Sequence, residues 1–436
     1  MRIACLQFSP KLGKPAENVA RANVILEAAS PPDIDLLVLP ELAFTGYNFP
    51  SLVAILPHLE PTSAGLSTTW AKTVASQYNC IVTVGYPELY SPSTSANSPN
   101  FTNQILAYNS TVTVAPNGQI LAHYRKTHLY YTDETWAQES PEGWLSTPLT
   151  FAPKTESEKF VQASFGICMD LNPYQFTAPW EAYEFCAHAL AKESEILVLS
   201  MAWLTRLPEQ DLLEQAEEPD LNTLSYWIER MKPLVDGEKE VIVVCANRSG
   251  MEPGKNPIGE EEGVRYAGSS WVGKVGRGVV RIWQITGKAI EQVIVADTKV
   301  TPQWELRMKS GIEGETCLLV EPELGSEGFQ QRNSPSREKR HLLDAIRTNP
   351  VNKKVLSLVS PSFRPFNALT TSSASIYIAL VHLAQLGVLI EQREQIDKAE
   401  QPNRTNNEND LHEFLCKCTA CWTRDNNSHS DLRQRR

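Results

Sequence analysis

Apolar positions along the first 300 residues follow two different periods. Short apolar runs of strand length occur at 3–8, 36–39, 80–85, 161–167, 196–201 and 241–246. Segments with apolar residues at three- and four-residue spacing, which is typical of amphipathic helices, lie between these runs at 15–29, 68–77, 180–191 and 221–231. Strands that alternate with helices in this way predict an α/β fold.

Two turn signals modify this picture. Pro116-Asn117-Gly118 separates two strand-like runs, 104–114 and 119–124, and Thr286-Gly287 lies between the runs 279–284 and 292–297. A turn of this composition between two strand-like runs favours a hairpin. A layered α/β sandwich therefore fits the pattern better than a simple doubly wound sheet.

The composition changes after about Thr301. Residues 321–340 are rich in charge, Gly, Ser and Pro and resemble a linker, and residues 391–409 are polar and charged. Segments with so few apolar residues bury too little surface to fold alone. We expect a catalytic domain over residues 1–300 and a C-terminal extension over residues 301–436, partly helical and partly disordered.

Charge and cysteine content limit the classes of function. The 436-residue chain carries a net charge of -11, which argues against nonspecific attraction to nucleic acid or to anionic membranes. Nine cysteines, an odd number spread widely, fit a reducing compartment better than a disulfide framework. The N-terminus lacks the pattern of a signal peptide, and the late apolar run 376–390 is too short to span a bilayer comfortably. These features predict a cytoplasmic or nuclear protein.

Three reactive side chains follow the ends of predicted strands. Glu41 comes just after the run 36–39, Lys126 follows the run 119–124, and Cys168 follows Ile167 directly. A thiol that attacks an amide needs a general base and a group that stabilises the oxyanion. A carboxylate and a lysine at neighbouring strand ends could supply both, so the three residues predict a thiol amidohydrolase.

The motifs around these residues resemble the nitrilase, or carbon–nitrogen hydrolase, superfamily over about residues 1–300. They are Pro40-Glu41, Tyr124-Arg125-Lys126 and Gly166-Ile167-Cys168-Met169-Asp170. Within the superfamily, Cys168–Phe176, Leu42–Phe49 and Thr132–Trp136 are similar to the branch of fungal protein N-terminal amidases. The resemblance implies a nitrilase-like α-β-β-α sandwich. It also implies that N-terminal Asn and Gln of proteins or peptides are deamidated to Asp and Glu, upstream of degradation that reads the new N-terminus.

The resemblance implies a role for each catalytic residue. Glu41 would be the general base, Cys168 the nucleophile that forms a thioester, and Lys126 the oxyanion stabiliser. A second glutamate is expected soon after the lysine to orient the substrate or the lysine. Glu134 is the best match, and Asp133 and Glu139 lie close enough in sequence to be alternatives. We further expect substrate contacts from Tyr47, Asp133, Trp136, Met169, Asp170 and Trp203. No cofactor and no metal is expected, because thiol, carboxylate and ammonium suffice.

Other interpretations stay open at this point. Asp170 could be a structural hydrogen-bond acceptor, and Asp133, Asp170 and Glu181 compete unranked for the ammonium of the substrate. Cys416, Cys418 and Cys421 have the residue types of a zinc site but lack the paired spacing. A small-molecule amidase or carbamoylase and a non-catalytic scaffold are the alternative functions. The oligomeric state does not follow from the sequence.

Overall fold

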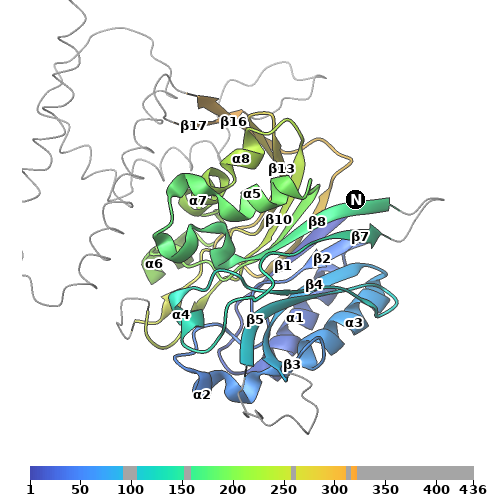
Figure 1. Ribbon diagram of the computed structural model, residues 1–436, viewed down its shortest axis with the longest axis vertical. Helices are drawn as coiled ribbons and strands as arrows, with labels where there is room; N and C mark the ends of the chain where they lie inside the picture. The colour runs from blue at the N-terminus through green and yellow to red at the C-terminus, as the bar shows by residue number, and fades with distance from the viewer. Residues whose placement is uncertain (92–105, 152–158, 257–261, 311–315, 322–436) are drawn as a thin grey trace, which may run out of the picture. The chain divides into compact units, whose positions relative to one another are not determined.

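The fold was described from a computed structural model of the chain, which defines residues 1–91, 106–151, 159–256, 262–310 and 316–321. Two sheets dominate these residues (Figure 1). The first contains, in spatial order, β15 (Gln292–Asp297), β1 (Arg2–Gln7), β2 (Leu36–Val38), β4 (Ile81–Tyr90), β5 (Leu106–Val114) and β6 (Ile120–Arg125), and β3 (Glu60–Pro61) pairs with β4.

The second sheet has eight strands. Their order is β17 (Thr316–Glu321), β16 (Trp304–Ser310), β14 (Val279–Ile285), β13 (Trp271–Gly276), β10 (Val241–Ala246), β9 (Ile196–Ser200), β8 (Lys159–Ile167) and β7 (Ser146–Phe151). A small separate ladder joins β11 (Met251–Glu252) to β12 (Val264–Arg265).

Helices cover the outer face of each sheet (Figure 1). The longer ones are α1 (Pro15–Ala29), α3 (Leu66–Tyr78), α5 (Glu184–Ala191) and α7 (Leu221–Arg230). Short helices are α2 (Leu52–Ile55), α4 (Tyr131–Glu134), α6 (Glu209–Glu214) and α8 (Lys232–Val235). Single 3₁₀ turns occur at η1 (Leu56–His58), η2 (Cys168–Leu171), η3 (Tyr174–Phe176) and η4 (Trp180–Ala182).

The alternation of side chains along β1 explains the layers. Ala4 and Leu6 pack in a cluster with residues of α1 and α3, whereas Ile3 and Cys5 join the core that includes strands of the second sheet. Successive strand residues point to opposite faces, so each strand of the first sheet buries one face under helices and the other against the second sheet. The α-β-β-α sandwich predicted from the sequence is confirmed.

Most predicted elements agree with the structure within a few residues. The hairpin expected around Thr286-Gly287 is wrong: β14 pairs with β13 and β16 in the second sheet, whereas β15 pairs with β1 in the first. The helix expected over 180–191 is shorter, because the turn η4 and the left-handed Tyr183 precede α5. The sequence patterns gave no sign of β7 or β13. β7 contains Pro148 and lies at the edge of its sheet, where proline is tolerated. β13 contains two glycines that interrupt its apolar pattern.

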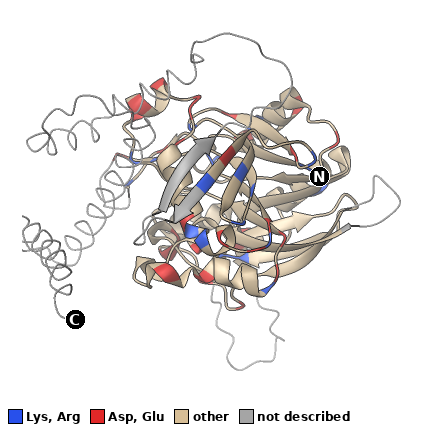
Figure 2. Ribbon diagram, turned by 90° about the horizontal axis from the view of Figure 1, so that it is seen from above, with Lys and Arg blue, Asp and Glu red and all other residues tan. Residues whose placement is uncertain are grey.

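The second sheet continues past residue 300, where composition suggested a domain boundary. β16 pairs with β14, and β17 pairs with β16. Ion pairs link the strands: Arg281 contacts Glu240 and Glu305, and Lys274 also contacts Glu240, so acidic and basic residues alternate across these strands (Figure 2). The described residues, which end at 321, belong to one compact unit.

Several sequence features lie outside the described residues. They are the linker-like segment beyond residue 321, the apolar run 376–390, the polar segment 391–409 and the cysteine cluster 416–421. Within the described residues, none of the helices has the length and apolar content that a membrane-spanning segment requires.

Candidate active site

Lys126 is completely buried between two carboxylates. Its Nζ donates hydrogen bonds to Oε1 of Glu41 at 2.6 Å and to Oδ2 of Asp133 at 2.5 Å. All three side chains are inaccessible to solvent. Asn109 completes the cluster, because its Nδ2 donates to Oε1 of Glu41 at 2.7 Å and to Oδ1 of Asp133 at 2.9 Å. Two predicted residues, Glu41 and Lys126, are therefore in direct contact.

The loop that carries Glu41 is held by both sheets. The backbone N–H of Glu41 donates to the carbonyl of Met201, which follows β9, and that of Ala43 donates to Gly85 in β4. Gly85 is needed for close approach. A Cβ on this residue would lie 2.7 Å from the backbone N of Leu42 and 2.8 Å from Cα of Glu41, which is closer than real Cβ contacts. The glycine thus lets the Glu41 loop pass against β4.

Cys168 lies at the junction of β8 and η2. Its φ of 43° places a non-glycine residue in the left-handed region, a strained conformation that is often found at functional sites. Its side chain is 9% exposed. Burial and then the charge of Glu41 raise the pKa of the Cys168 thiol well above its usual range, while Lys126 and the backbone N–H of Ala202 lower it. The thiol is therefore neutral at rest and needs a base.

Burial and the neighbouring charges shift the pKa values of both Glu41 and Lys126. Burial raises the pKa of the Glu41 carboxyl to about 7; Lys126 and Asn109 oppose this rise, and Asp133 adds to it. Burial lowers the pKa of Lys126, but Asp133, Glu41 and Cys168 raise it, and the net pKa lies above the ordinary value of lysine. Lys126 is consequently a permanent ammonium, whereas Glu41 can exchange a proton near neutral pH.

Two oxygen atoms and one N–H group of this cluster make no hydrogen bond within the described residues and could bind a substrate. Oε2 of Glu41 and Oδ1 of Asn109 are buried without a hydrogen-bond partner. Among the described residues, Lys126 donates hydrogen bonds to Glu41 and Asp133 alone, and an ammonium has three N–H donors. A free acceptor and a free donor beside a nucleophile are the groups that amide hydrolysis requires.

The acidic residue beside Lys126 is Asp133, and the expectation for Glu134 is corrected. Glu134 is exposed, and no hydrogen bond within the described residues joins it to Lys126. Both residues lie in the single turn α4, where neighbouring positions point about 100° apart. A contact with Tyr130 decides which of the two side chains faces Lys126: the backbone N–H of Tyr130 donates to Oδ2 of Asp133 at 3.0 Å.

Asp170 accepts hydrogen bonds from backbone N–H groups near Cys168 and Lys126. Its Oδ2 accepts hydrogen bonds from the backbone N–H of Ile167 at 2.8 Å and from the hydroxyl of Tyr124 at 2.7 Å. Its Oδ1 accepts from the backbone N–H groups of Thr127 and His128 at 3.1 and 2.8 Å. Both oxygens are thus occupied, so the structural interpretation of Asp170 fits and a substrate contact does not. The carboxylate ties the turn after β8 to the loop after Lys126.

The remaining predicted contact residues differ in their distance from this cluster. The hydroxyl of Tyr47 donates to Oδ2 of Asp133 at 3.2 Å, and its ring centroid lies 5.7 Å from Nζ of Lys126. Trp136 is buried in the same hydrophobic cluster as Tyr47. Met169 is buried directly after Cys168. Trp203 is half-buried, and its ring packs on Tyr226 and Trp227.

Two polar residues of the site were not singled out as functional from the sequence. Asn109 lies in β5, a buried strand with an unusual run of polar residues, and this run is the signal that could have identified it. Glu252 accepts hydrogen bonds from the backbone N–H groups of Tyr47 and Asn48 and from the hydroxyl of Tyr266. Glu252 lies more than 200 residues from Tyr47 in the sequence, and no local pattern indicates the contact.

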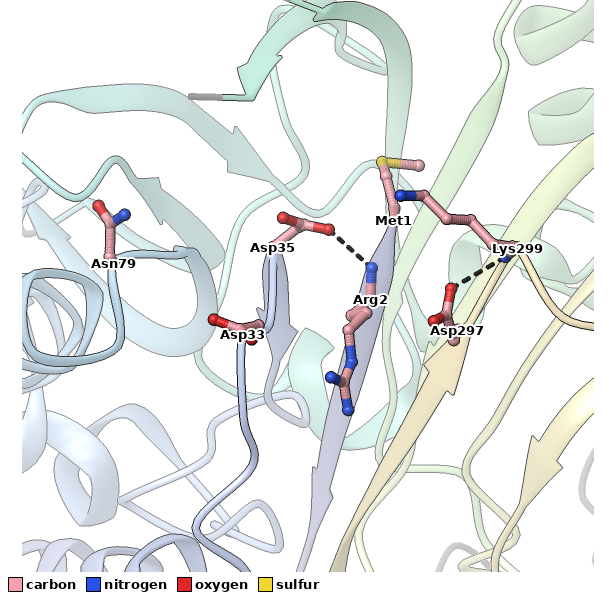
Figure 3. Close-up of a pocket in the computed structure, with 7 residues that line it drawn as sticks. All are labelled: Met1, Arg2, Asp33, Asp35, Asn79, Asp297 and Lys299. Carbon is pink, nitrogen blue, oxygen red and sulfur yellow. Dashed lines mark hydrogen bonds between the residues drawn. The ribbon is translucent and has the colours of Figure 1, made fainter. Parts of the chain in front are cut away.

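A separate cavity of about 520 Å³ lies at the other end of the first sheet (Figure 3). It is lined by Met1, Arg2, Asp33, Asp35, Asn79, Asp297 and Lys299. Asp35 precedes β2 and Asn79 precedes β4, whereas Glu41 follows β2, so this cavity is not part of the cluster around Lys126. The described residues contain no group of three His, Cys, Asp or Glu side chains able to hold a metal ion.

Comparison with known proteins identifies the family to which the chain belongs. Residues 2–178 match the carbon-nitrogen hydrolase family. A protein N-terminal amidase of Schizosaccharomyces pombe is 32% identical over 313 residues, which cover 68% of this chain and 99% of the relative. The chain belongs to the carbon-nitrogen hydrolase family. The resemblance inferred from the motifs is confirmed, and the protein is a hydrolase that acts on carbon–nitrogen bonds.

Further relatives share the same name. A protein N-terminal amidase of Saccharomyces cerevisiae is 31% identical over 217 residues, which are 47% of this chain and 45% of that protein. A crystal structure of an N-terminal amidase matches with a TM-score of 0.58 at 22% identity, over 68% of this chain and 96% of that chain. A structure of that enzyme with an Asn-Glu-Ala peptide matches equally well. These solved structures support the fold of this member of the family.

Proposed function

We propose that this hydrolase is a protein N-terminal amidase, which converts N-terminal Asn or Gln of proteins and peptides to Asp or Glu and releases ammonia. The observation that carries the proposal is the buried cluster of Glu41, Lys126 and Asp133, whose charges act on the thiol of the strained Cys168. The similarity to N-terminal amidases along almost the whole length of one relative supports the choice of substrate. The new acidic N-terminus would feed a degradation pathway that reads N-terminal residues.

The first half of the reaction forms a thioester. The unpartnered Oε2 of Glu41 takes the proton of the Cys168 thiol, and the sulfur attacks the carbonyl carbon of the side-chain amide. The free N–H of Lys126 stabilises the oxyanion. Glu41 then returns the proton to the amide nitrogen, the C–N bond breaks, and ammonia leaves.

The second half hydrolyses the thioester. Glu41 removes a proton from water, which attacks the thioester carbonyl, and the oxyanion again faces Lys126. Collapse breaks the C–S bond, releases the carboxylic acid and returns the proton to the Cys168 sulfur. Asp133 acts on this sequence through Lys126, which it holds in place, and is a positioning residue.

The side chains near the cluster would define the substrate. We assign Tyr47, Trp136, Met169 and Trp203 to the surroundings of a short carboxamide side chain. Tyr47 contacts Asp133, and Trp136 packs in the same hydrophobic cluster as Tyr47. Met169 follows Cys168, and Trp203 follows Ala202, whose backbone N–H interacts with the Cys168 thiol. The ammonium of the substrate needs a carboxylate or carbonyl partner at the mouth. We further propose a cytoplasmic or nuclear location, because the nine cysteines are odd in number and spread widely along the chain.

The test measures ammonia release from an Asn-peptide, a Gln-peptide and an N-acetyl-Asn peptide. We expect release from the two peptides with a free N-terminus, none from the acetylated one, and none from any peptide with Cys168→Ala. Cys186→Ala is the matched control, since Cys186 is equally buried but its thiol donates to the carbonyl of Arg230, away from the cluster.

The other outcomes separate the alternatives. Equal rates on acetylated and free Asn-peptides would reject N-terminal specificity. Hydrolysis of small amides alone would identify a small-molecule amidase or carbamoylase. No ammonia from any amide, in a folded protein, would leave the non-catalytic scaffold as the explanation.

A further inference from the structure

Asn109 is the one neutral side chain that contacts both carboxylates around Lys126 within the described part of the chain. It projects from β5, whereas Glu41 follows β2 and Asp133 belongs to α4. The two hydrogen bonds from Nδ2, at 2.7 Å and 2.9 Å, use both N–H groups of the amide. Its backbone carbonyl also accepts a hydrogen bond from the backbone N–H of Lys126 at 2.8 Å. A single residue therefore contacts all three charged members of the cluster.

The orientation of this amide is fixed by charge. If the amide were turned over, Oδ1 would face two carboxylate oxygens, and both carboxylates would lose a donor while gaining a repulsive neighbour. The NH₂ group must therefore lie between the carboxylates. The side chain is wholly buried, so no water can replace these donors without rearrangement.

The charge balance of the cluster shows why these donors matter. Two carboxylates share one ammonium, so the cluster carries an excess negative charge in a site without solvent. Two neighbouring carboxylates in such a site resist ionising together unless hydrogen-bond donors stabilise the charged forms. Lys126 and Asn109 each supply one donor to each carboxylate, and Asp133 also accepts from the hydroxyl of Tyr47 and the backbone N–H of Tyr130. For Glu41, Asn109 is therefore the one donor besides Lys126 among the described residues.

The same contacts decide which oxygen of Glu41 acts. Oε1 accepts from both Lys126 and Asn109, whereas Oε2 has no partner. We propose that Asn109 is a positioning residue that lies between Glu41 and Asp133, favours the ionised form of Glu41 and presents its Oε2 as the proton acceptor for Cys168. The proposal rests on the proposed role of Glu41 but not on the identity of the amide substrate.

Other groups that face Glu41 must be held constant in a test. Its electrostatic neighbours besides Lys126 and Asp133 are the thiol of Cys168 and the phenols of Tyr47 and Tyr266. Burial raises the pKa of both phenols well above the usual range, so they stay neutral near pH 7. Changes in that range then arise from Glu41 and the residues that bind it.

The test follows alkylation of Cys168 by iodoacetamide as a function of pH. Iodoacetamide is a small primary amide, and reaction at Cys168 is followed by mass spectrometry of the peptide that contains it. In the full-length wild type, we expect the rate to rise with ionisation of Glu41. Asn109→Asp has the same shape but replaces the donors by a third carboxylate. We expect its midpoint to move up by about one pH unit or more, which slows alkylation at pH 7 by about fivefold or more.

Asn18→Asp is the matched control. Asn18 is also buried, and its Nδ2 donates to two backbone carbonyls, of Lys11 and Phe44. This variant should lose stability while the midpoint of alkylation stays at the wild-type value. A merely structural role for Asn109 predicts the same behaviour for Asn109→Asp, so an unchanged midpoint in a folded Asn109→Asp protein would overturn the proposal.

A second variant keeps the test decisive if Asn109→Asp does not fold. Asn109→Leu removes both donors without adding a charge. We expect its midpoint also to lie above that of the wild type, because burial then acts on Glu41 with one donor fewer; a wild-type midpoint in this variant would contradict the proposal. Because alkylation needs no peptide, absence of peptide hydrolysis would reject the proposed function and leave this test intact.

Discussion

Two buried carboxylates, Glu41 and Glu88, accept hydrogen bonds from neighbouring residues in or next to the same two strands, β5 and β6. In β5, Asn109 binds Glu41 and the next residue, Ser110, binds Glu88. At the end of β6, Arg125 binds Glu88 and the next residue, Lys126, binds Glu41. Successive residues of a strand point to opposite faces, so each strand contributes to both carboxylates at once.

The pKa values of the two carboxyl groups nevertheless shift in opposite directions. Glu88 has both oxygens occupied by Arg125, His123, Ser110 and Thr62. Burial raises the pKa of Glu88, but hydrogen bonds from His123 and Arg125 outweigh it and lower the pKa below the ordinary value. Saturation with donors makes Glu88 a fixed structural charge.

Glu41 is equally buried but keeps one oxygen without a partner, and its pKa is raised to about 7. The difference shows that burial alone does not identify a functional carboxylate. The unoccupied oxygen of Glu41 is what suits the proposed base, because it leaves a proton acceptor in a buried site near the proposed nucleophile.

Replacement of the two adjacent cations should have the largest and most contrasting effects. Lys126→Met removes the proposed oxyanion donor, and we expect a loss of kcat of about 10³-fold or more in ammonia release from an Asn-peptide. Arg125→Met breaks the ion pair with Glu88 and should cost about 3 to 5 kcal/mol of unfolding free energy, while kcat of the folded protein stays within about threefold of wild type.

Urea unfolding and active-site titration separate these effects. A folded Arg125→Met protein that loses activity as severely as Lys126→Met would show that the Glu88 cluster takes part in the chemistry. Comparable activity of Lys126→Met and the wild type would reject the proposed oxyanion role.

The positions of the reactive residues follow from the sequence to a large extent. Glu41, Lys126 and Cys168 could be predicted because each follows a strand with a clear apolar pattern. The choice between Asp133 and Glu134 could not, because it depends on the phase of a one-turn helix fixed by a contact with Tyr130.

Contacts between distant segments were equally hidden. Glu252 reaches the Tyr47 loop from a two-residue strand, and no periodic pattern exists in so short an element. The edge strand β7 was hidden by Pro148, since a proline normally argues against a strand. The layers of the fold were predictable because alternation and helical spacing extend over many residues in the longer elements.

The two acidic residues of α4 offer a finer test of the comparison. Asp133→Asn removes one of the two carboxylates that hold Lys126, and we expect kcat for ammonia release to fall by about 10²-fold. Glu134→Gln changes an exposed side chain and should leave kcat within about twofold, since surface changes rarely affect a buried site. If Glu134→Gln proved the more damaging change, the assignment of Asp133 would be wrong.

The pH dependence should show the smallest effect and the one most specific to Glu41. Because its pKa is raised to about 7, Glu41 is protonated below that pH and cannot accept the thiol proton. We expect kcat/KM for an Asn-peptide to reach a plateau above about pH 8 and to be about tenfold lower at pH 6.

Glu88 provides the internal contrast for this measurement. Its lowered pKa means that its contribution to stability is present above the unfolded value of about 4.3 and is lost only as the pH falls through the lower folded value. Far-UV circular dichroism should therefore be unchanged between pH 6 and 8, so that the loss of activity cannot come from unfolding at Glu88. A rate that stays on its plateau down to pH 6 would show that Glu41 is not the base.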